Sequence, residues 1–428
     1  MISALHHRNY RLFFSGQSVS LVGTWITRVA TSWLVYRLTG STLLLGIVGF
    51  CGQIPMLFLA PIAGVFVDRW DRRRVLVVTQ VLSLLQSLAL AVLTLAGIIT
   101  IAEILALQLV QGLINAFDTP ARQAFVVSMI EDRGDLPNAI ALNSLMVNGS
   151  RIIGPSIAGL LIAAVGEGWC FLLDAISYVA VVASLVAMRG IAAPAARPSS
   201  RVGEDLSAGF RYVSSFAPVR SALLLLALVG IAGMPYTVLM PAVATRALHG
   251  GAQLLGVLMT ASGVGAVCGG LYLAQRRTVI GLGRVIAVAT TTFGVALVAF
   301  ALSRSLVLSL LILPVVGGGF MVQMAATNTV VQTLVEERLR GRVMAFYTMA
   351  FLGTAPLGSL LAGAVSSRLG TATTILLGGV TCILGGLVFA FHLPRLRALA
   401  RPTYVARGIL VAAEESTELA QEPASSGR

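Results

Sequence analysis

Two long apolar runs flank the stretch Gly64-Val65-Phe66-Val67-Asp68-Arg69-Trp70-Asp71-Arg72-Arg73-Arg74. The first run covers residues 43–67 and the second covers residues 75–98. Each is longer than the roughly 20 residues that a helix needs to cross a bilayer. The stretch therefore predicts a tight, charged turn between two membrane-spanning helices.

Three kinds of residue in this turn have different physical roles. Gly64 lets two helices approach closely. Asp68, at the rim of the membrane, can accept hydrogen bonds from the N-terminus of a neighbouring helix. The arginines offer flat, forked donors to carboxylates or phosphates. The alternative interpretation is an ordinary basic loop.

The spacing resembles the loop signature of the major facilitator superfamily of secondary transporters. That signature is Gly, three residues, Asp-Arg, any residue, Gly, Arg, and then Arg or Lys. The match holds at Gly64, Asp68, Arg69, Arg72 and Arg73. Asp71 stands where the family has its second glycine. The resemblance implies a gating loop that takes part in a conformational cycle.

The composition is that of a membrane protein. Of the 428 residues, 57% are hydrophobic and 11% charged, and the mean hydropathy is +0.90, whereas soluble domains have about a quarter of charged residues. All thirty basic residues are arginines, and the formal net charge is +13. In a soluble protein this charge would suggest nucleic acid, but in a membrane protein it indicates arginine-rich cytoplasmic loops. We expect a lipid bilayer and no nucleic acid as partners.

Several classes of function lack their sequence signals. The four cysteines are far apart, with no CxxC or Cys/His cluster, so we expect no metal site and no disulfide framework. The four histidines fall at expected helix ends or in loops, and no Ser/His/Asp arrangement indicates an enzyme. A Gly-x4-Gly-Lys-Ser/Thr loop, which an ATP-driven pump would need, is absent. We therefore expect neither an enzyme nor a cofactor.

Apolar runs separated by polar breaks predict twelve spans. They fall near residues 12–36, 43–67, 75–98, 101–126, 139–164, 169–188, 219–243, 253–274, 284–302, 305–331, 343–365 and 371–391. The first follows a basic N-terminus, contains Arg28, has no small-residue cleavage site after it, and is expected to be retained. With a cytoplasmic N-terminus, the outer loops hold only Arg37, Arg246, Arg304 and Arg368. This asymmetry places both termini inside.

Internal repetition divides the spans into two sets of six. Residues 126–133 (VVSMIEDR) reappear in altered form as residues 331–338 (VQTLVEER), and residues 154–159 correspond to residues 358–363. The superfamily resemblance implies two parallel six-helix halves around a central cavity. We expect halves at 1–188 and 219–392. Between them, residues 189–218 form a cytoplasmic linker with an amphipathic helix, and 393–428 form a largely disordered tail.

Charges inside the expected spans mark candidate sites, because an intramembrane charge is costly. Arg28, Asp118 and Arg151 lie on spans that face the cavity in the superfamily, and Asp174 is expected to be structural. Asp118 can pair with Arg122 one turn later. Alternatively, it can pair with Arg72 or Arg69 as a gate latch. Arg28 is interpreted as a substrate contact or as a partner of Asp118.

The fifth span carries a second motif. Its residues are Asn143, Asn148, Ser150, Arg151, Gly154, Pro155, Ala158 and Gly159. It resembles the antiporter motif of drug exporters, in which a kinked helix packs tightly between the halves. Ordinary small-residue packing is the alternative. The family's span-four arginine is missing, since Gln108 stands in its place, which weakens proton coupling by the familiar route. The candidate cavity residues are Arg28, Asp118, Arg151, Asn143 and Asn148.

Phrases across the first half narrow the resemblance to one bacterial branch, the transmembrane secretion effector family. They are residues 9–13, 116–124, 138–144, 153–155 and 171–178. The resemblance implies an inner-membrane exporter of a small amphiphilic, siderophore-like or drug-like molecule. It would work by alternating access, with protons as the coupling ion, as a monomer in the bacterial inner membrane. An uptake permease of the same fold and a non-transporting membrane receptor are the alternatives.

The arginine asymmetry predicts the topology directly. Reporter fusions after residues 70, 195, 280 and 400 should report the cytoplasm, and fusions near residues 40, 100, 168, 249 and 304 the outside. Alkaline phosphatase and green fluorescent protein fusions measure the two sides independently. A periplasmic signal at residue 195 would overturn the six-plus-six arrangement.

Overall fold

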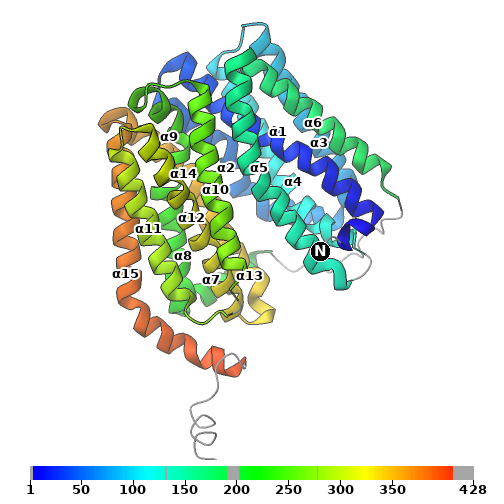
Figure 1. Cartoon of the computed structure of the whole chain (residues 1–428). Coiled ribbons are helices and arrows are strands. Elements are labelled where there is room, and N and C mark those ends of the chain that lie inside the picture. Colours follow the sequence, from blue (N-terminus) through cyan, green and yellow to red (C-terminus); the bar gives the residue numbers. More distant parts are fainter. Residues whose placement is uncertain (1–2, 131–132, 190–201, 277, 408–428) are drawn as a thin grey trace, which may run out of the picture.

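The computed structural model describes residues 3–130, 133–189, 202–276 and 278–407. Within these residues the chain is helical, with fifteen α-helices labelled α1 to α15 (Figure 1). The first group is α1 (Arg8–Thr39), α2 (Thr42–Arg69), α3 (Arg72–Leu95), α4 (Ile101–Ser128), α5 (Leu136–Val165) and α6 (Glu167–Ala187). The remainder are α7 (Val202–Ser215), α8 (Ala217–Leu228), α9 (Tyr236–Ala242), α10 (Ala252–Ala274), α11 (Leu282–Leu302), α12 (Leu306–Leu334), α13 (Glu337–Thr348), α14 (Thr354–Leu369) and α15 (Thr371–Ala406).

Short irregular helices complete the described chain. Two 3-10 turns, Ser3–His6 and Arg133–Asp135, precede α1 and α5. Three π-helical turns, Val229–Gly233, Val243–Ala247 and Met349–Gly353, interrupt helices of the second half. The first joins α8 to α9, the second continues α9 to Ala247, and the third joins α13 to α14, which gives two composite spans, Ala217–Ala247 and Glu337–Leu369. π-helical turns of this kind are frequent at functional sites.

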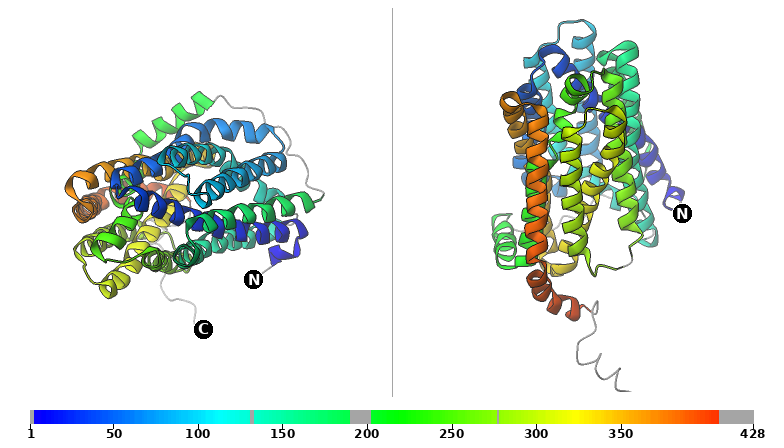
Figure 2. Two further views of the ribbon diagram at one scale, coloured as in Figure 1. Left: turned by 90° about the horizontal axis from the view of Figure 1, so that it is seen from above. Right: turned by 60° about the vertical axis from the view of Figure 1, so that its left-hand side comes forward.

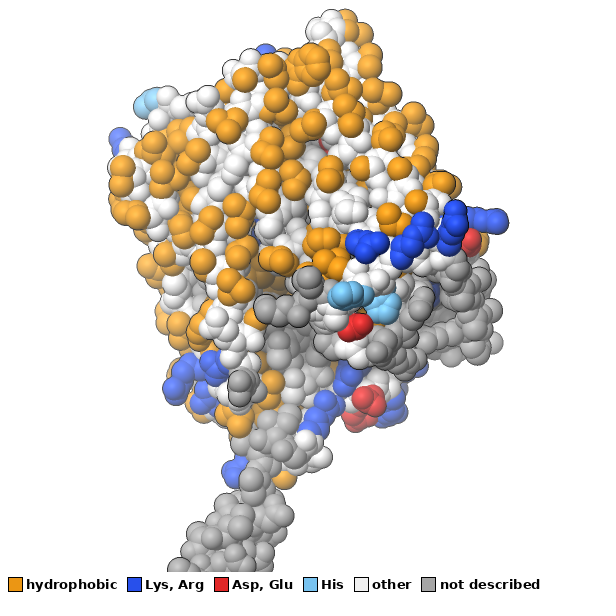
Figure 3. Space-filling view, turned by 45° about the vertical axis from the view of Figure 1, so that its right-hand side comes forward, with side chains coloured by type: hydrophobic (Ala, Val, Ile, Leu, Met, Phe, Trp, Pro, Cys, Tyr) orange, Lys and Arg blue, Asp and Glu red, His pale blue; other side chains and the backbone are white. Residues whose placement is uncertain are grey.

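Eleven helical spans of the described chain are long and apolar enough to cross a membrane. This confirms the expected all-α membrane protein. The first expected span, α1, is 32 residues long but is not among the eleven, because Arg28 and many Ser and Thr residues lower its hydropathy. The total of twelve spans therefore stays a prediction. On one side of the molecule, apolar side chains cover the upper surface, while most charged side chains lie below them (Figure 3).

The helices form two groups that lie side by side (Figure 2). In the first, α1 packs on α5 and α6, α3 on α6, and α2 on α4. In the second, α11 packs on α12 and α15, and α10 on α12. The groups meet mainly where α2 contacts α14 and where α5 contacts α10. The exact bounds of the two halves stay a prediction.

The linker before the second group and the tail after it differ in part from the sequence-based prediction. Of the linker, residues 190–201 lie outside the described residues, whereas α7 packs on α13, with 6.2 Å between the ring centroids of Phe210 and Phe346. Residues 393–406, expected to belong to the tail, continue α15 as a helix. They do so because Leu393, Leu396 and Ala400 are buried against the second group. The remainder of the tail, 408–428, lies outside the described residues.

The buried cores show which end of the molecule is closed. We call the end with the described N-terminus and the turn at Trp70 the terminal end, and the end with Gly40, Gly166 and Gly370 the far end. One core combines side chains of both groups, such as Ile26 and Leu255. Two further cores lie toward the terminal end, one built from the first group alone and one from the second. The groups therefore share a core at one end and are separate at the other.

Close backbone contacts hold the far end shut. A Cβ atom on Gly46 of α2 would lie 2.5 Å from the carbonyl oxygen of Ser359 and 2.9 Å from Cα of Gly363, both on α14. On the other side, a Cβ on Gly159 of α5 would lie 3.0 Å from Cα of Gly256 on α10. Only glycine permits such an approach of two helices. These two contacts bring the groups together beside the cavity described below.

Gly46→Ala should destabilise the protein by about 1–3 kcal/mol, because the added methyl group meets backbone atoms that cannot move aside. Gly149→Ala is the matched control, since a Cβ on Gly149, also helical, meets nothing within 4 Å. The control should be neutral or stabilising by up to about 1 kcal/mol through helix propensity. Unfolding of the purified proteins in detergent measures both. Equal stability of the two variants would contradict the close α2–α14 contact.

Candidate functional site

A cavity of about 240 Å³ lies between the two groups of helices. Helices α1 to α6 supply its charged and amide-bearing side chains, including Arg28, Arg151 and Asp174. The second group supplies mainly apolar side chains, among them Met234, Met240 and Met259. The two walls therefore differ in chemistry, one polar and basic and the other apolar. Such a cavity suits an amphiphilic molecule.

The guanidinium groups of two arginines lie close to the ring of Trp25. The guanidinium carbon of Arg28, on α1, is 4.6 Å from the centroid of the Trp25 ring, and that of Arg151, on α5, is 5.5 Å away. Both arginines line the cavity, and Arg28 is exposed to it. Gly154 makes this possible, because a Cβ there would lie 2.4 Å from Cβ of Trp25. The structure thus brings together two of the predicted cavity residues.

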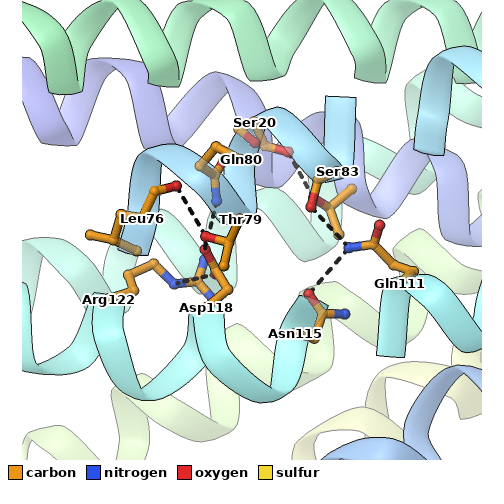
Figure 4. A network of polar contacts seen from close by, with 10 residues as sticks. Ser20, Leu76, Thr79, Gln80, Ser83, Gln111, Asn115, Asp118 and Arg122 are labelled. Atoms are coloured by element: carbon orange, nitrogen blue, oxygen red, sulfur yellow. Dashed lines mark hydrogen bonds and ion pairs between the residues drawn. The ribbon is translucent and has the colours of Figure 1, made fainter. Parts of the chain in front are cut away.

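Asp118 lies elsewhere, in a buried network between α3 and α4 (Figure 4). Its carboxylate accepts hydrogen bonds from Thr79 Oγ1 at 2.9 Å and from Gln80 Nε2 at 2.7 Å. Arg122 Nε is 3.7 Å away, which is the pairing within one helical turn that the sequence suggested. Asp118 is not among the residues that line the described cavity. Its partnership with Arg28 has no support in this conformation.

The predicted gating loop is stabilised by helix capping. Asp71 is the N-cap of α3, and its carboxylate accepts hydrogen bonds from the backbone amides of Arg73 at 2.9 Å and Arg74 at 3.4 Å. The side chain of Arg73 donates to the last carbonyls of α6, those of Leu185 and Val186, at 2.8 and 2.9 Å. Both contacts match the charge of the helix ends that they meet. In the sequence alone, Asp71 stands out only as a departure from the signature.

Other residues of this loop are only partly described. Arg72 donates a hydrogen bond to the carbonyl of Ala124 on α4 at 3.3 Å. Gly64, Asp68 and Arg69 belong to α2 by their backbone, and the side-chain surroundings at these positions lie outside the described part of the chain. A latch between this loop and Asp118 therefore stays a prediction.

The motif on α5 contacts helices on two sides. Pro155 lines the cavity, and a Cβ on Gly256 of α10 would lie 2.6 Å from its carbonyl oxygen. Ser150 Oγ bonds to the carbonyl of Val147 at 2.8 Å within the helix. Asn148 likewise donates to the carbonyl of Ser144 at 2.8 Å, and neither it nor Asn143 is among the described residues that line the cavity. The small residues of the motif thus place α5 between α1 and the second group.

Asp174 is a cavity residue that the sequence analysis interpreted as structural. It is the one acid among the described lining residues and is itself only 1% exposed. Ser87 Oγ donates to its carboxylate at 2.8 Å, and Ser177 Oγ lies 3.5 Å from the other carboxylate oxygen. A Cβ on Gly23 of α1 would come within 2.6 Å of the same carboxylate. The glycine at position 23 was the available signal that α1 passes this close to α6.

Tyr236 was also missed by the sequence analysis. It follows Pro235 where the first span of the second group is interrupted, and its hydroxyl lies 2.6 Å from that of Ser262. Tyr236 and Arg151 both line the cavity. Within the described residues, no group of His, Cys, Asp and Glu is arranged to hold a metal ion.

Comparison with known proteins identifies a family. A family model described as transmembrane secretion effector matches residues 1–415. The staphyloferrin A transporter of Staphylococcus aureus is 28% identical over 89% of this chain and 95% of its own length. The multidrug efflux pump Tap of Mycolicibacterium fortuitum is 30% identical, with 88% and 93% covered. The enterobactin exporter EntS of Citrobacter koseri is 24% identical, with 94% and 96% covered.

Solved structures share the fold. The nucleoside transporter NupG superimposes with a TM-score of 0.71 at 17% sequence identity, over 90% of this chain and 98% of that one. At this identity the likeness shows the fold alone. It agrees with two groups of helices around a central cavity.

Asp118→Ala should lower the free energy of unfolding by about 2–3 kcal/mol, because Thr79 and Gln80 lose their buried acceptor. Arg122→Ala should cost less than about 1 kcal/mol, since the 3.7 Å contact involves a partly exposed arginine and Asp118 keeps its hydrogen bonds to Thr79 and Gln80. Unfolding in mixed detergent micelles measures both. Equal losses would contradict this assignment, because the ion pair rather than the bonds to α3 would then account for the effect.

Proposed function

The chain belongs to the transmembrane secretion effector family, and on that premise we propose that it exports a small amphiphilic molecule from the bacterial cytoplasm. The family and the relatives are transporters of the major facilitator type, so the chain is a transporter and not an enzyme. The finer proposal is secondary active export of a siderophore-like or drug-like compound. The names of the staphyloferrin A transporter, the Tap efflux pump and the enterobactin exporter support this class.

The observation that carries the proposal is a cavity between two groups of helices that touch closely at one end. At the far end, the hydroxyls of Ser156 and Thr260 lie 2.7 Å apart across the groups, and Arg246 bonds to the carbonyl of Gly40 at 2.9 Å. At the terminal end the two groups have separate cores. With both termini in the cytoplasm, as the arginine asymmetry predicts, this is an inward-facing conformation. A cavity with access from one side at a time is the requirement for alternating access.

The cavity walls suit a molecule with a polar and an apolar part. Methionine side chains on the second group are flexible and adapt to ligands of different shapes. Amide side chains such as Gln53 and Asn115, on the first group, offer both donors and acceptors. This division supports an amphiphile over a small hydrophilic nutrient.

Asp174 is the residue that we propose for proton coupling. It lines the cavity and is hydrogen-bonded by serine hydroxyls, and no ion pair to it is present within the described residues. A buried carboxylate without a cation is costly, and binding a proton removes that cost. Proton binding at Asp174 can therefore alternate with exposure of the cavity to the two sides. This route does not need the arginine that Gln108 replaces.

Transport into inverted membrane vesicles tests direction and coupling together. With one proton exchanged per substrate, an acidic lumen that differs by one pH unit should drive about tenfold accumulation of the exported compound. Labelled siderophores and drugs are the candidate compounds. Asp174→Asn should abolish this gradient-driven accumulation, whereas Asp71→Asn, a change at an exposed helix cap, should retain it.

Two outcomes would contradict the proposal in different ways. Accumulation only in right-side-out vesicles would indicate an uptake permease. Undiminished gradient-driven accumulation by Asp174→Asn would leave export intact and remove Asp174 from the coupling route.

A further inference from the structure

Two arginines share one wall of the cavity without an acidic partner. Arg28 and Arg151 both lie against Trp25 and are close enough to repel each other electrostatically. Within the described residues, no ion pair or side-chain hydrogen bond joins either guanidinium to a carboxylate. Arg151 lies in a span long and apolar enough to cross a membrane, and Arg28 lies on α1, which packs on that span; an uncompensated charge there is unfavourable.

Three buried acidic residues of helices α1 to α6 already have hydrogen-bond or ion-pair partners other than these arginines. Asp118 accepts hydrogen bonds from α3 and faces Arg122. Glu167 is held at the far end by Arg37, with 2.6 Å between Nε and Oε1. Asp174 is hydrogen-bonded by Ser87. None of these three carboxylates neutralises the pair at Trp25.

The geometry therefore points to an anion as the missing partner. We propose that Arg28, Trp25 and Arg151 form an anion-binding site, and that the transported molecule carries at least two acidic oxygen groups on an apolar body. The inference rests on the proposed transport function and specifies its substrate class. A guanidinium can hold a carboxylate through two parallel hydrogen bonds. Cation–π contact with the Trp25 indole holds both guanidinium groups at this place on the cavity wall.

The remainder of the cavity is compatible with such a ligand. The Thr31 hydroxyl and Gln111 Oε1 are buried at the cavity wall, with no hydrogen-bond partner among the described residues. They can meet hydroxyl or amide groups of the ligand. Opposite them, the methionines of the second group contact an apolar body. A cationic drug would place its charge beside two arginines, which is unfavourable.

The experiment measures binding rather than transport. Naphthalene-2,6-dicarboxylate serves as an amphiphilic dianion, and its neutral diamide serves as a probe of the same shape. Calorimetric titration of the full-length protein in detergent gives the dissociation constants. The wild type should bind the dianion about 100-fold more tightly than the diamide, as expected for two charge-assisted interactions.

Single substitutions assign the effect to the two arginines. Arg28→Gln and Arg151→Gln should each weaken dianion binding about tenfold or more and leave diamide binding unchanged. Arg28→Lys should weaken dianion binding less than Arg28→Gln does, because lysine keeps the positive charge although it lacks the two parallel N–H donors of the guanidinium. Arg304→Gln removes an exposed arginine outside the cavity and is the control for net charge. It should bind both probes like the wild type.

A stability measurement separates a ligand-binding role from a structural one. Without ligand, Arg28→Gln should unfold at the same or a higher temperature than the wild type, because repulsion by Arg151 is removed. A structural arginine would instead lower that temperature when it is replaced.

The outcomes distinguish this inference from the proposed function. Equal affinity for dianion and diamide, or unchanged dianion binding by both glutamine variants, would overturn the anion site even if the protein exports other compounds. Arginine-dependent dianion binding without transport in vesicles would support the site and contradict the exporter.

Discussion

Charge compensation inside the bilayer is the constraint on which the rest of this structure depends. Most charged side chains of the first six helices are compensated by hydrogen bonds or ion pairs with neighbouring residues. Asp118 is surrounded by Thr79, Gln80 and Arg122, and Arg73 caps the end of α6. Arg28, Arg151 and Asp174, none of which has an ion-pair partner among the described residues, are the exception, and they are found at the cavity. Since uncompensated charge in a membrane protein marks a functional site, this exception defines the most informative part of the molecule.

The two halves contribute different physical properties to transport. The first carries the ionisable side chains of the cavity, whereas the second carries methionines and three π-helical turns. One of these turns, Val229–Gly233, ends just before the cavity residues Met234 and Tyr236. We infer that the first half recognises the polar part of the substrate. The interrupted helices of the second half can adjust around its apolar part, since a π-helical turn weakens the regular hydrogen-bond ladder.

The contact between the halves relies on backbone rather than on side chains. At Gly46 and Gly363, and again at Gly159 and Gly256, two helices touch with no side chain between them. Near these contacts, the polar interactions across the groups include the hydroxyl pair of Ser156 and Thr260 and the bond from Arg246 to the carbonyl of Gly40. An interface of this kind closes tightly and separates at modest cost, which suits the alternating access proposed above.

The sequence by itself determined the solvent, the helical fold and the family. Apolar runs of bilayer length and the spacing at Gly64–Arg73 are local patterns, so they can be read without contacts. The sequence also indicated Arg28 and Arg151 as cavity residues, because an arginine within an apolar run can be recognised without knowing any tertiary contact.

Only the tertiary structure decided how these residues are grouped. It separated Asp118 from Arg28, placed Asp174 at the cavity, and made Asp71 a helix cap. It also brought two arginines from different helices to the ring of Trp25, which depends on the close approach that Gly154 allows. Such pairings are set by how the helices cross, and crossing geometry depends on small residues of both partners at once. The sequence alone shows which charged residues lie in apolar spans and need a compensating partner. Which partner each of them has depends on how the helices pack.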